Sequence, residues 1–543
     1  MLLRDKGNFA ETSRQFRWPN PTHINIAEAI CDRHVPAAAD TVALSFCDHN
    51  DLFRHWTYRE LQSHSCKLAH GLAALGIGAG DRVAILLGQQ IETVLTHIAN
   101  ARLGAIGVPL FRLFGPDALA YRLANSGAKI LITDAAGYAA VAPIRDTLIE
   151  LEEILLTDGD PGSFWPLLDQ ASDQPVCAQT NASDPFCLIY TSGTTGSPKG
   201  AVLSQQTLLG HLPGVQMPHE FFPQAGDRFW TPADWAWIGG LFDVLLPSLY
   251  CQIPVVGAAA RKFDPEWACW LMAKQQVRNV FFPPAALRAI KNARLDPQGH
   301  GVKLRSIGSG GEPLSDELHA WAHAAFATAI NEFYGQTEAN LTVSGMAGQF
   351  PRQSGHIGKA VPGHSLAILT TDGCQADAGE VGEIALNRTA PDGSADPVIF
   401  SGYWRNPAAS AAKFSGDWLL TGDLGAMDDQ GYIQFVARQD DLINVKGYRI
   451  GPAEIERCLE RHPAVSKAAV IAEADQSDDN QIVAFVQLDA QAPPQNEREL
   501  TATLRAHVQD RLAKHMAPHR VNALAELPVT ATGKLKRAAL RQK

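Results

Sequence analysis

The 543-residue sequence lacks any apolar run long enough to span a membrane, and no two of its cysteines are spaced as CxxC. A membrane helix needs about 20 mostly apolar residues, so we expect no membrane span. The polar, charged first eighteen residues, Met1–Trp18, do not resemble a signal peptide. The nine cysteines are scattered, which disfavours a disulfide framework or a structural zinc site and favours the reducing cytoplasm.

Basic residues are outnumbered by acidic ones, 46 against 57, which gives a net charge of −11. A global attraction to nucleic acid or to an anionic membrane is therefore not expected. Hydrophobic residues make up 46% and charged residues 19% of the chain, which is a globular composition and excludes disordered, collagenous and coiled-coil classes. The length predicts several domains.

Short apolar, β-branched runs alternate with amphipathic stretches as far as about residue 340. The predicted strands include Arg82–Leu87, Lys129–Thr133, Phe186–Tyr190, Asn279–Phe282 and Leu304–Ile307, and the predicted helices include Tyr58–Leu75 and Pro116–Ser126. This alternation is typical of α/β folds, in which helices pack on stacked, mostly parallel sheets. From about Gly355 to Ala437, short strands with Gly-Asp turns indicate a β-rich subdomain.

A charged cluster at Arg438–Asp441 precedes what we predict to be a small α+β unit. Its expected elements are a helix at Ala453–His462, strands at Lys467–Ala472 and Ile482–Leu488, and a helix with Leu500, Leu504, Val508 and Leu512 on one face. The predicted domains are thus an N-terminal domain at 1–438, with its β-rich subdomain at about 355–437, and a mobile C-terminal domain at 439–543.

The most specific motif is the loop Tyr190–Gly200, YTSGTTGSPKG, which follows an apolar strand. Glycines let backbone N–H groups approach an anion closely, hydroxyl side chains add donors, and a lysine adds a positive charge. The residues expected to hold the phosphates of a nucleotide are Thr191, Ser192, Gly193, Thr194, Thr195, Gly196 and Lys199. A Walker P-loop does not fit, because Pro198 and Gly200 flank the lysine where that motif requires Gly and Ser or Thr.

This loop resembles the signature of the adenylate-forming enzymes, which include acyl-CoA synthetases, luciferases and peptide-synthetase adenylation domains. Further motifs appear in that family's order across almost the whole chain. The resemblance implies that a carboxylic acid attacks the α-phosphate of ATP, with Mg²⁺ as cofactor, to give an acyl-adenylate and pyrophosphate. Coenzyme A fits as the thiol that then takes the acyl group, because no carrier domain follows the last motif.

Two segments resemble the family's adenine pocket. The first is Gly311-Glu312-Pro313, where glycine at a strand end lets a flat ring lie against the backbone, although a simple turn is the alternative. The second segment comprises Glu332, Phe333, Tyr334, Gly335 and Gln336. The Tyr334 ring can stack on adenine.

The same string continues into Thr337 and Glu338. Thr337 can hydrogen-bond a phosphate. Glu338 is a hard oxygen ligand suited to Mg²⁺, and Thr194 of the phosphate loop is the second predicted metal ligand.

The motif Thr421-Gly422-Asp423 supplies a carboxylate that can accept the ribose hydroxyls. The resemblance assigns Arg438 to the same ribose. Asp440 falls where the family has its hinge, a place where a few linker residues absorb large backbone rotations.

In the C-terminal domain the resemblance places Lys446, Gly447 and Tyr448 along the pantetheine tunnel. Arg449 is expected to contact phosphate during adenylation. Lys534, on a Gly-flanked loop, is expected to reach the carboxylate and the α-phosphate and to stabilise the charge of the transition state.

Two positions bear on the identity of the acid. Trp237 matches a tryptophan of the acyl pocket in acetyl- and medium-chain enzymes, although core packing is the alternative. Gly335 stands where acetate-specific enzymes carry a bulky tryptophan. The sequence looks most like the medium-chain acyl-CoA synthetases, above all in Phe400–Trp404 and Thr421–Glu456, so we expect an aliphatic acid of middle length.

Alternatives remain open at this point. Glycine in place of that tryptophan should leave the acyl pocket open at Gly335. A CoA ligase for aryl, short or branched acids fits such an open pocket equally well, and a luciferase-like oxygenase shares the motifs. A non-catalytic nucleotide-binding module of the same fold is a further alternative. The expected partners are small molecules, namely the acid, ATP and CoA, and the protein is expected to be a monomer or a homodimer.

Overall fold

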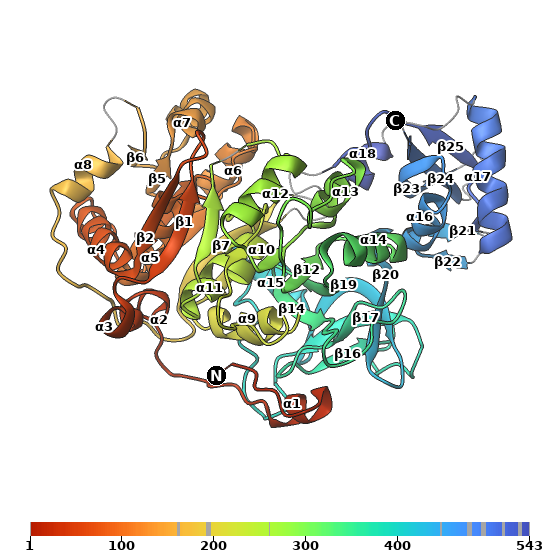
Figure 1. Cartoon of the computed structure of the whole chain (residues 1–543), viewed down its shortest axis with the longest axis horizontal. Coiled ribbons are helices and arrows are strands. Elements are labelled where there is room, and N and C mark those ends of the chain that lie inside the picture. The colour runs from red at the N-terminus through yellow and green to blue at the C-terminus, as the bar shows by residue number, and fades with distance from the viewer. Residues whose placement is uncertain are drawn as a thin grey trace. The chain divides into compact units, whose positions relative to one another are not determined.

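The computed structural model describes residues 2–159, 163–191, 197–259, 261–441, 443–445, 448–474, 480–489, 496–512, 516–529 and 535–541. Contacts divide the chain into two compact units (Figure 1). The first comprises Met1–Leu366 and Leu386–Leu419, and the second comprises Ala367–Ala385 and Leu420–Lys543. The domain boundaries drawn from the sequence, at 438 and at about 355, stay predictions.

The first unit contains a mostly parallel sheet with strand order β6-β5-β3-β4-β7-β8. Only β8 runs antiparallel to its neighbour among the described pairings of this sheet. The strands are β3 (Arg82–Leu86), β4 (Ile106–Pro109), β5 (Ile130–Thr133), β6 (Glu153–Leu156), β7 (Pro185–Thr191) and β8 (Lys199–Ser204). The predicted strand that follows the phosphate loop is therefore confirmed.

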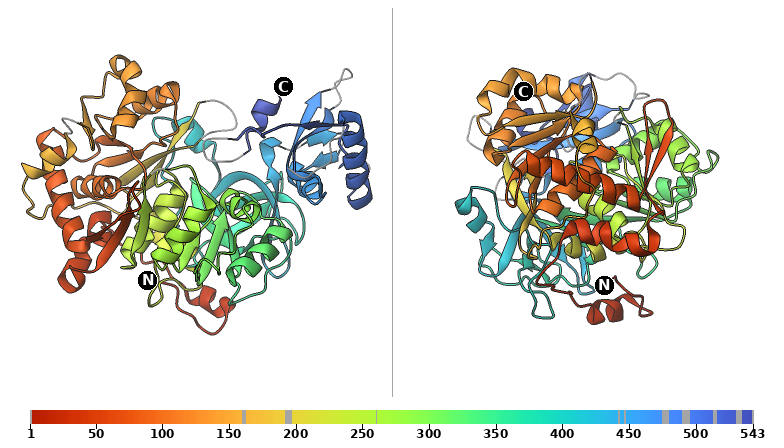
Figure 2. Two further views of the ribbon diagram at one scale, coloured as in Figure 1. Left: turned by 45° about the horizontal axis from the view of Figure 1, so that its top comes forward. Right: turned by 90° about the vertical axis from the view of Figure 1, so that its left-hand side faces the viewer.

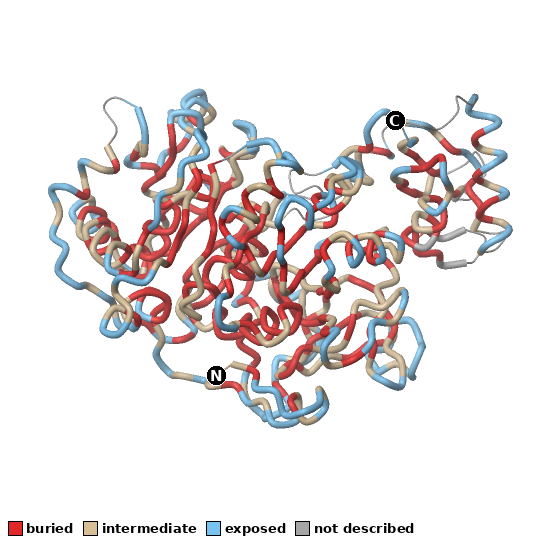
Figure 3. Tube along the Cα trace, viewed as in Figure 1, coloured by how far each residue is buried: buried red, intermediate tan, exposed pale blue. Residues whose placement is uncertain are grey.

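Helices cover both faces of this sheet, as the residues of β3 show. Val83 and Ile85 pack into the cluster that contains α4 (Tyr58–Ala74) and α5 (Ile91–Leu103), whereas Ala84 and Leu86 pack into the cluster that contains α6 (Pro116–Ser126). A strand buried on both sides has no polar face, which explains the unbroken apolar run of β3. Figure 3 shows these strands as a buried layer between helices.

A second sheet of the first unit has the order β15-β14-β13-β12-β11-β9-β10-β1-β2. Its strands are β1 (Val42–Cys47), β2 (Phe53–Thr57), β9 (Phe229–Trp230), β10 (Val255–Ala258), β11 (Asn279–Phe281), β12 (Ser306–Gly310), β13 (Ile330–Gln336), β14 (Ala339–Ser344) and β15 (Gly358–Ala360). The middle of the sheet, from β1 to β13, is parallel. The expectation of stacked, parallel-type sheets is confirmed (Figure 2).

The helices associated with these sheets differ in length. The longer ones are α9 (Thr207–Gln216), α12 (Pro265–Lys274), α13 (Pro284–Asn292) and α14 (Asp316–Phe326). The shorter ones are α1 (Phe9–Gln15), α2 (Ile26–Ile30), α3 (Val35–Ala38), α7 (Ala135–Val141), α8 (Phe164–Asp169), α10 (Ile238–Gly240), α11 (Leu246–Tyr250) and α15 (Pro407–Ala411). A π-helical turn, Leu241–Leu245, joins α10 to α11.

The second unit begins with strands β16 (Leu366–Leu369), β17 (Gly382–Asn387), β19 (Trp418–Met427) and β20 (Tyr432–Arg438), which are neighbours in that order. The two-residue strand β18 (Phe414–Ser415) pairs with the start of β19. Between residues 355 and 437 the regular elements are therefore strands with one short helix, α15, within the described residues.

The rest of the second unit is a small α+β body. Its elements are β21 (Ile443–Val445), β22 (Tyr448–Ile450), α16 (Pro452–Glu460), β23 (Val465–Ala474), β24 (Asn480–Leu488), α17 (Glu497–Arg511), β25 (Arg520–Ala523) and α18 (Arg537–Leu540). Leu500, Leu504 and Val508 of α17 are buried against the sheet β23-β24-β25, as the four-residue repeat predicted. Leu512 follows the end of the helix and is not part of it.

No helix among the described residues is long and apolar enough to cross a membrane.

Candidate functional site

The phosphate loop is framed by two antiparallel strands. Thr191 ends β7 and Lys199 begins β8, and these two residues are opposite each other in the ladder. The Thr191 hydroxyl donates to the Lys199 carbonyl at 3.4 Å. The tip of the loop, Ser192-Gly193-Thr194-Thr195-Gly196, lies outside the described residues.

A segment distant in sequence lies along β8. Trp404 N–H donates to the Gly200 carbonyl at 2.7 Å, and Val202 exchanges backbone hydrogen bonds with the Ser401–Gly402 segment at 2.9 Å. This places the Tyr403 ring beside the phosphate loop, with the Lys199 ammonium 5.2 Å from the ring centroid. Such a distance allows a cation–π contact.

The predicted metal ligand Glu338 lies at the tip of a hairpin. β13 ends at Gln336 and β14 begins at Ala339, which is opposite it, so that Thr337 and Glu338 form the turn. Glu338 is only 6% exposed, and its Oε1 accepts a 2.5 Å hydrogen bond from the Tyr403 hydroxyl. Tyr403 therefore contacts both Glu338 and Lys199, two residues that the sequence places 139 positions apart.

Tyr403 is a candidate site residue that could not be recognised from the sequence. The segment Phe400–Trp404 was used only as a mark of similarity to one subfamily. A tyrosine in a short aromatic string between two motifs carries no signal of its own for a metal or phosphate site. Its role depends on a pairing with β8 and on a hydrogen bond across 65 residues, both of which are long-range contacts.

Gly335 sits at an irregularity of the hairpin. The register between β13 and β14 shifts between Tyr334 and Gln336. A Cβ at Gly335 would lie 2.3 Å from the backbone nitrogen of Leu341, which itself has a positive φ of 54°. A non-glycine residue with such a φ is strained. Proximity of the backbone accounts for glycine at position 335.

Glu332 and Phe333, which precede Gly335 in β13, are held by different kinds of contact. Both carboxylate oxygens of Glu332 are engaged: Oε1 with His319 Nε2 at 2.9 Å and Oε2 with the Leu314 N–H at 3.1 Å. The Phe333 ring packs 5.1 Å from the Phe281 ring. The side chains of Glu332 and Phe333 thus fix the strand, and the part of these two residues in adenine binding stays a prediction.

Glycines let the Phe333 ring lie against β12. A Cβ at Gly310 would come within 2.5 Å of that ring, and one at Gly308 within 3.2 Å. The strand predicted at Leu304–Ile307 is observed at Ser306–Gly310. Its glycine residues leave space that the aromatic side chain of the next strand occupies. Glycine does admit a flat ring here, and the ring is the protein's own.

The Gly311-Glu312-Pro313 segment follows directly. Gly311 has a φ of +95°, and no described atom lies within 4 Å of the place that a Cβ would take, so the backbone conformation and not crowding requires glycine. The Glu312 carboxylate pairs with Arg288 at 2.5 Å. Pro313 is exposed.

The two predicted ribose contacts meet in the second unit. Asp423 in β19 is opposite Arg438 in β20, and Arg438 Nε lies 3.1 Å from Asp423 Oδ1. The Asp423 backbone N–H is held by the Thr421 hydroxyl at 3.1 Å, and Gly422, with a φ of +76°, turns the chain beside it. The pair is preformed in the ladder, which suits a common ligand.

The remaining predicted residues of the second unit are only partly described. Asp440 lies in a 3₁₀ turn, Gln439–Asp441, directly after β20. Tyr448 and Arg449 belong to β22, in which Arg449 is opposite Asn444. Lys446, Gly447 and Lys534 lie outside the described residues.

Trp237 is half-buried at the start of α10. Its ring is 5.9 Å from the Phe111 ring, and it borders the large core of the first unit. The acyl-pocket role and the packing role are thus compatible, since part of the side chain remains accessible.

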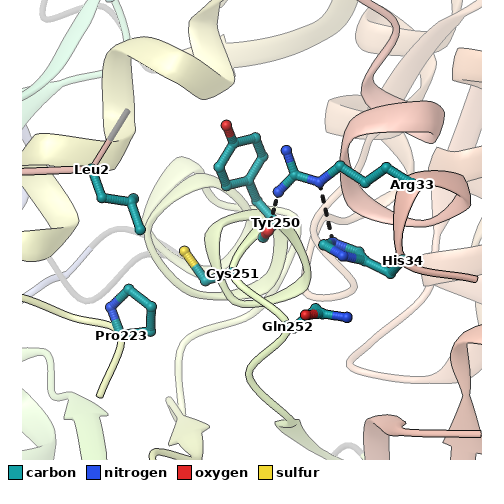
Figure 4. A pocket seen from close by; sticks show the side chains of 7 residues that line it. All are labelled: Leu2, Arg33, His34, Pro223, Tyr250, Cys251 and Gln252. Atoms are coloured by element: carbon teal, nitrogen blue, oxygen red, sulfur yellow. Dashed lines mark hydrogen bonds between the residues drawn. The ribbon is translucent and has the colours of Figure 1, made fainter. Parts of the chain in front are cut away.

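A separate depression of about 420 Å³ lies elsewhere in the first unit (Figure 4). Its lining residues are Leu2, Arg33, His34, Pro223, Tyr250, Cys251 and Gln252. The Arg33 guanidinium is used within the protein: it donates to the Tyr250 carbonyl and lies 3.7 Å from the Tyr250 ring centroid. None of the residues predicted from the motifs lines this depression.

Comparison with protein families gives two matches in series along the chain. The model of AMP-binding enzymes matches residues 31–404, and the model of the AMP-binding enzyme C-terminal domain matches residues 454–534. The first match alone covers more than half of the sequence.

Individual relatives agree with the family models. The chain is 33% identical to the acyl-coenzyme A synthetase ACSM4, mitochondrial, of Homo sapiens, with 90% of this chain and 84% of that protein covered. It is 29% identical to the acetyl-coenzyme A synthetase of Pasteurella multocida (strain Pm70), with 97% and 85% covered. The solved structure of the anthranilate CoA ligase AuaEII in complex with anthranoyl-AMP matches with a TM-score of 0.86 at 27% identity, covering 96% of this chain and 97% of that one.

The two-part family match, the near full-length relatives and the shared fold agree with the motif order. The resemblance predicted from the signature loop is confirmed. The chain belongs to the AMP-binding enzyme family and is an adenylate-forming acyl-CoA synthetase, an acid–thiol ligase that uses ATP and CoA.

Proposed function

We propose that the acid is an aliphatic carboxylic acid of middle length, which the enzyme joins to CoA through an acyl-adenylate. The observation that carries the proposal is the environment of Gly335. The tryptophan of acetate-specific enzymes would place its Cβ 2.3 Å from Leu341 N and 2.7 Å from Asn340 Cα, both backbone atoms. The hairpin as folded has no room for that side chain, so the residue that closes the pocket on acetate is excluded in this conformation.

The chemistry explains the need for the predicted residues. A carboxylate is a poor electrophile, and adenylation gives it a good leaving group. Lys199 and the loop residues hold the β- and γ-phosphates, while Arg449 and Lys534 supply positive charge at the α-phosphate. Asp423 and Arg438 anchor the ribose. CoA thiol then attacks the acyl carbon, AMP leaves, and Lys446, Gly447 and Tyr448 line the pantetheine path.

Mg²⁺ belongs to the proposal through Glu338. Mg²⁺ is bound in nucleotide sites by one or two carboxylates together with phosphates and water, and a single hard anionic oxygen donor held by Tyr403 fits that donor set. Thr194 is the second proposed ligand. When bound, the ion neutralises charge on the phosphates. Glu338 orients it, and Tyr403 orients Glu338.

The test is pyrophosphate release from ATP·Mg with single acids from acetate through octanoate to dodecanoate, and with benzoate, each with and without CoA. A peak at mid-length aliphatic acids that needs CoA for turnover supports the proposal. A peak at acetate refutes the argument from Gly335, and a peak at benzoate moves the enzyme to the aryl branch. If the enzyme converts none of these acids, the proposed substrate class is wrong for this member of the family.

We also propose a cytoplasmic location and a monomeric or homodimeric state. All nine cysteines are free thiols, which suits a reducing compartment. Cell fractionation tests the first, and light scattering of the purified enzyme tests the second.

A further inference from the structure

A buried carboxylate lies close to the hairpin that carries Glu338. Asp243 belongs to the π-helical turn Leu241–Leu245, six residues after Trp237. Short π-helical turns occur frequently at functional sites. The other four residues of this turn are 0% exposed, whereas Asp243 is 4% exposed. Asp243 is therefore the one residue of this turn with exposed surface.

One oxygen of this carboxylate is fixed. Asn340 Nδ2 donates to Asp243 Oδ1 at 2.6 Å. Asn340 lies in β14, two residues after Glu338, and its Cα is one of the atoms that approach Gly335. Asp243 is thus tied to the hairpin that bears the proposed metal ligand Glu338 and the predicted acyl-pocket residue Gly335.

The other oxygen points toward Gly239. Asp243 Oδ2 lies 3.5 Å from the position that a Cβ at Gly239 would take, and the Phe281 ring lies 2.8 Å from it. Gly239 follows the predicted acyl-pocket residue Trp237 by two positions. No hydrogen-bond or ion-pair partner of Oδ2 occurs among the residues that the structure describes.

The neighbours of Asp243 are almost fully buried. Phe281, Asn340 and Glu338 are 5%, 5% and 6% exposed. A hydrogen bond made to Asp243 Oδ2 would therefore be shielded from solvent, which strengthens it.

A carboxylate in this position is costly to keep. Burial raises the pKa of Asp243 well above its ordinary value, and the Asn340 hydrogen bond opposes that rise only in part. Without a ligand, burial therefore favours the protonated form of Asp243. A hydrogen-bond donor brought to Oδ2 by a ligand favours the carboxylate form and offsets its desolvation penalty. A packed apolar residue would serve an unsubstituted aliphatic chain better.

We propose that the Asp243 carboxylate recognises a hydrogen-bond donor, a hydroxyl or ammonium group, on the chain of the acid substrate. The proposal rests on the proposed function, since it names a substituent of that acid. Asp243 Oδ2 accepts the hydrogen bond, and Asn340 positions the carboxylate.

The test compares matched acids. The ratio of kcat/KM for each ω-hydroxy or ω-amino acid to that for its plain parent is measured from propanoate to octanoate, with anthranilate against benzoate as an aryl pair. Wild-type enzyme is expected to favour at least one substituted acid by about tenfold or more, since hydrogen bonds to charged groups are strong. Hydroxyl and ammonium members of the series separate the two donor types.

The variant is Asp243→Asn, which keeps an oxygen for Asn340 and turns Oδ2 into a donor. Its preference for the substituted acid should fall about tenfold, while kcat/KM for the plain acid stays within about threefold. The matched control is Asp234→Asn, because Asp234 is a nearby acid whose carboxylate caps the Ala236 N–H at 2.8 Å. The control should leave the preference unchanged.

The outcomes are distinguishable. Equal loss for plain and substituted acids in Asp243→Asn, with a lowered melting temperature, means that Asp243 is structural and overturns the inference. A wild-type enzyme that prefers plain acids at every length overturns the inference and leaves the proposed function standing. Failure with every acid, plain or substituted, is a failure of the proposed function itself.

Discussion

Two Arg–Asp pairs of this enzyme differ in how completely they are closed. Arg102 is 0% exposed; its guanidinium donates to both oxygens of Asp32 at 2.7 and 2.8 Å and to the Ser65 hydroxyl. The Arg438 side chain is 39% exposed and approaches one oxygen of Asp423 at 3.1 Å. The first pair is saturated within the protein, whereas the Arg438 guanidinium of the second is partly exposed and can be reached by a ligand.

This difference separates structural from functional polar groups. A fully satisfied pair in the core fixes how α5 packs on its neighbours and has nothing left to offer a substrate. A half-open pair across a strand ladder is held in place by the sheet and remains available. We therefore expect the closed pair to affect stability and the open pair to affect nucleotide binding.

The largest effect is expected from Arg102→Met. Removing one partner of a buried ion pair leaves the other charge uncompensated, which costs about 3–5 kcal/mol of unfolding free energy. Urea denaturation measures this loss, and kcat/KM per folded molecule should be unchanged. Arg59→Met is the control, because the Arg59–Asp40 pair is 61% and 82% exposed and its loss should cost less than about 1 kcal/mol. Equal costs in the two variants would contradict the distinction.

Arg438→Gln should show the reverse pattern. The Arg438 side chain is 39% exposed, although its partner Asp423 is buried, so the loss of stability should be smaller than that of Arg102→Met. Charge-assisted hydrogen bonds to a ligand contribute about 1.5–3 kcal/mol, so the KM for ATP should rise roughly ten- to hundredfold. Pyrophosphate exchange measures this. An unchanged KM for ATP with a large loss of stability would make the Asp423–Arg438 pair structural after all.

Local signals in the sequence predicted the elements well. Pro116–Ser126 is observed with the predicted bounds because Gly115 and Pro116 start the helix and Gly127, with a φ of +65°, ends it. The motif residues Thr191, Lys199, Thr337 and Glu338 fall at strand ends and in a turn, where glycine and apolar patterning are informative.

Long-range contacts explain the structural features that could not be predicted from the sequence. The end of β12 depends on the Phe333 ring from the next strand, and the hold on Glu338 depends on Tyr403 from a segment 65 residues away. The positive φ of Leu341 follows from its approach to Gly335 and Gly214. None of these arrangements leaves a local pattern.

A buried histidine and an exposed one should likewise differ in their effect on stability. His219 is 2% exposed, and burial together with the Arg305 charge lowers its pKa to about 3. Because the unfolded chain takes up a proton near pH 6.5 and the folded one does not, stability should fall as the pH drops from about 6.5 toward 3, by up to about 1.4 kcal/mol per pH unit. The destabilisation caused by His219→Gln should therefore shrink between pH 7 and pH 5. Urea titrations at both values measure it, with exposed His323→Gln as the control; a constant difference would mean that His219 is protonated in the folded enzyme.

The smallest effect is expected for Tyr403, a buried residue that contacts a proposed ligand-binding residue. Tyr403 is 7% exposed, yet its hydroxyl holds Glu338, which we assign to Mg²⁺. Tyr403→Phe removes one hydrogen bond, worth about 0.5–1.5 kcal/mol, so half-saturation by Mg²⁺ should need about two- to tenfold more metal. Tyr58→Phe is the control, because that buried hydroxyl donates to the Leu249 carbonyl; it should cost similar stability and leave the Mg²⁺ dependence alone. If both variants shift the Mg²⁺ dependence equally, loss of packing explains the change, and Tyr403 belongs with the closed groups.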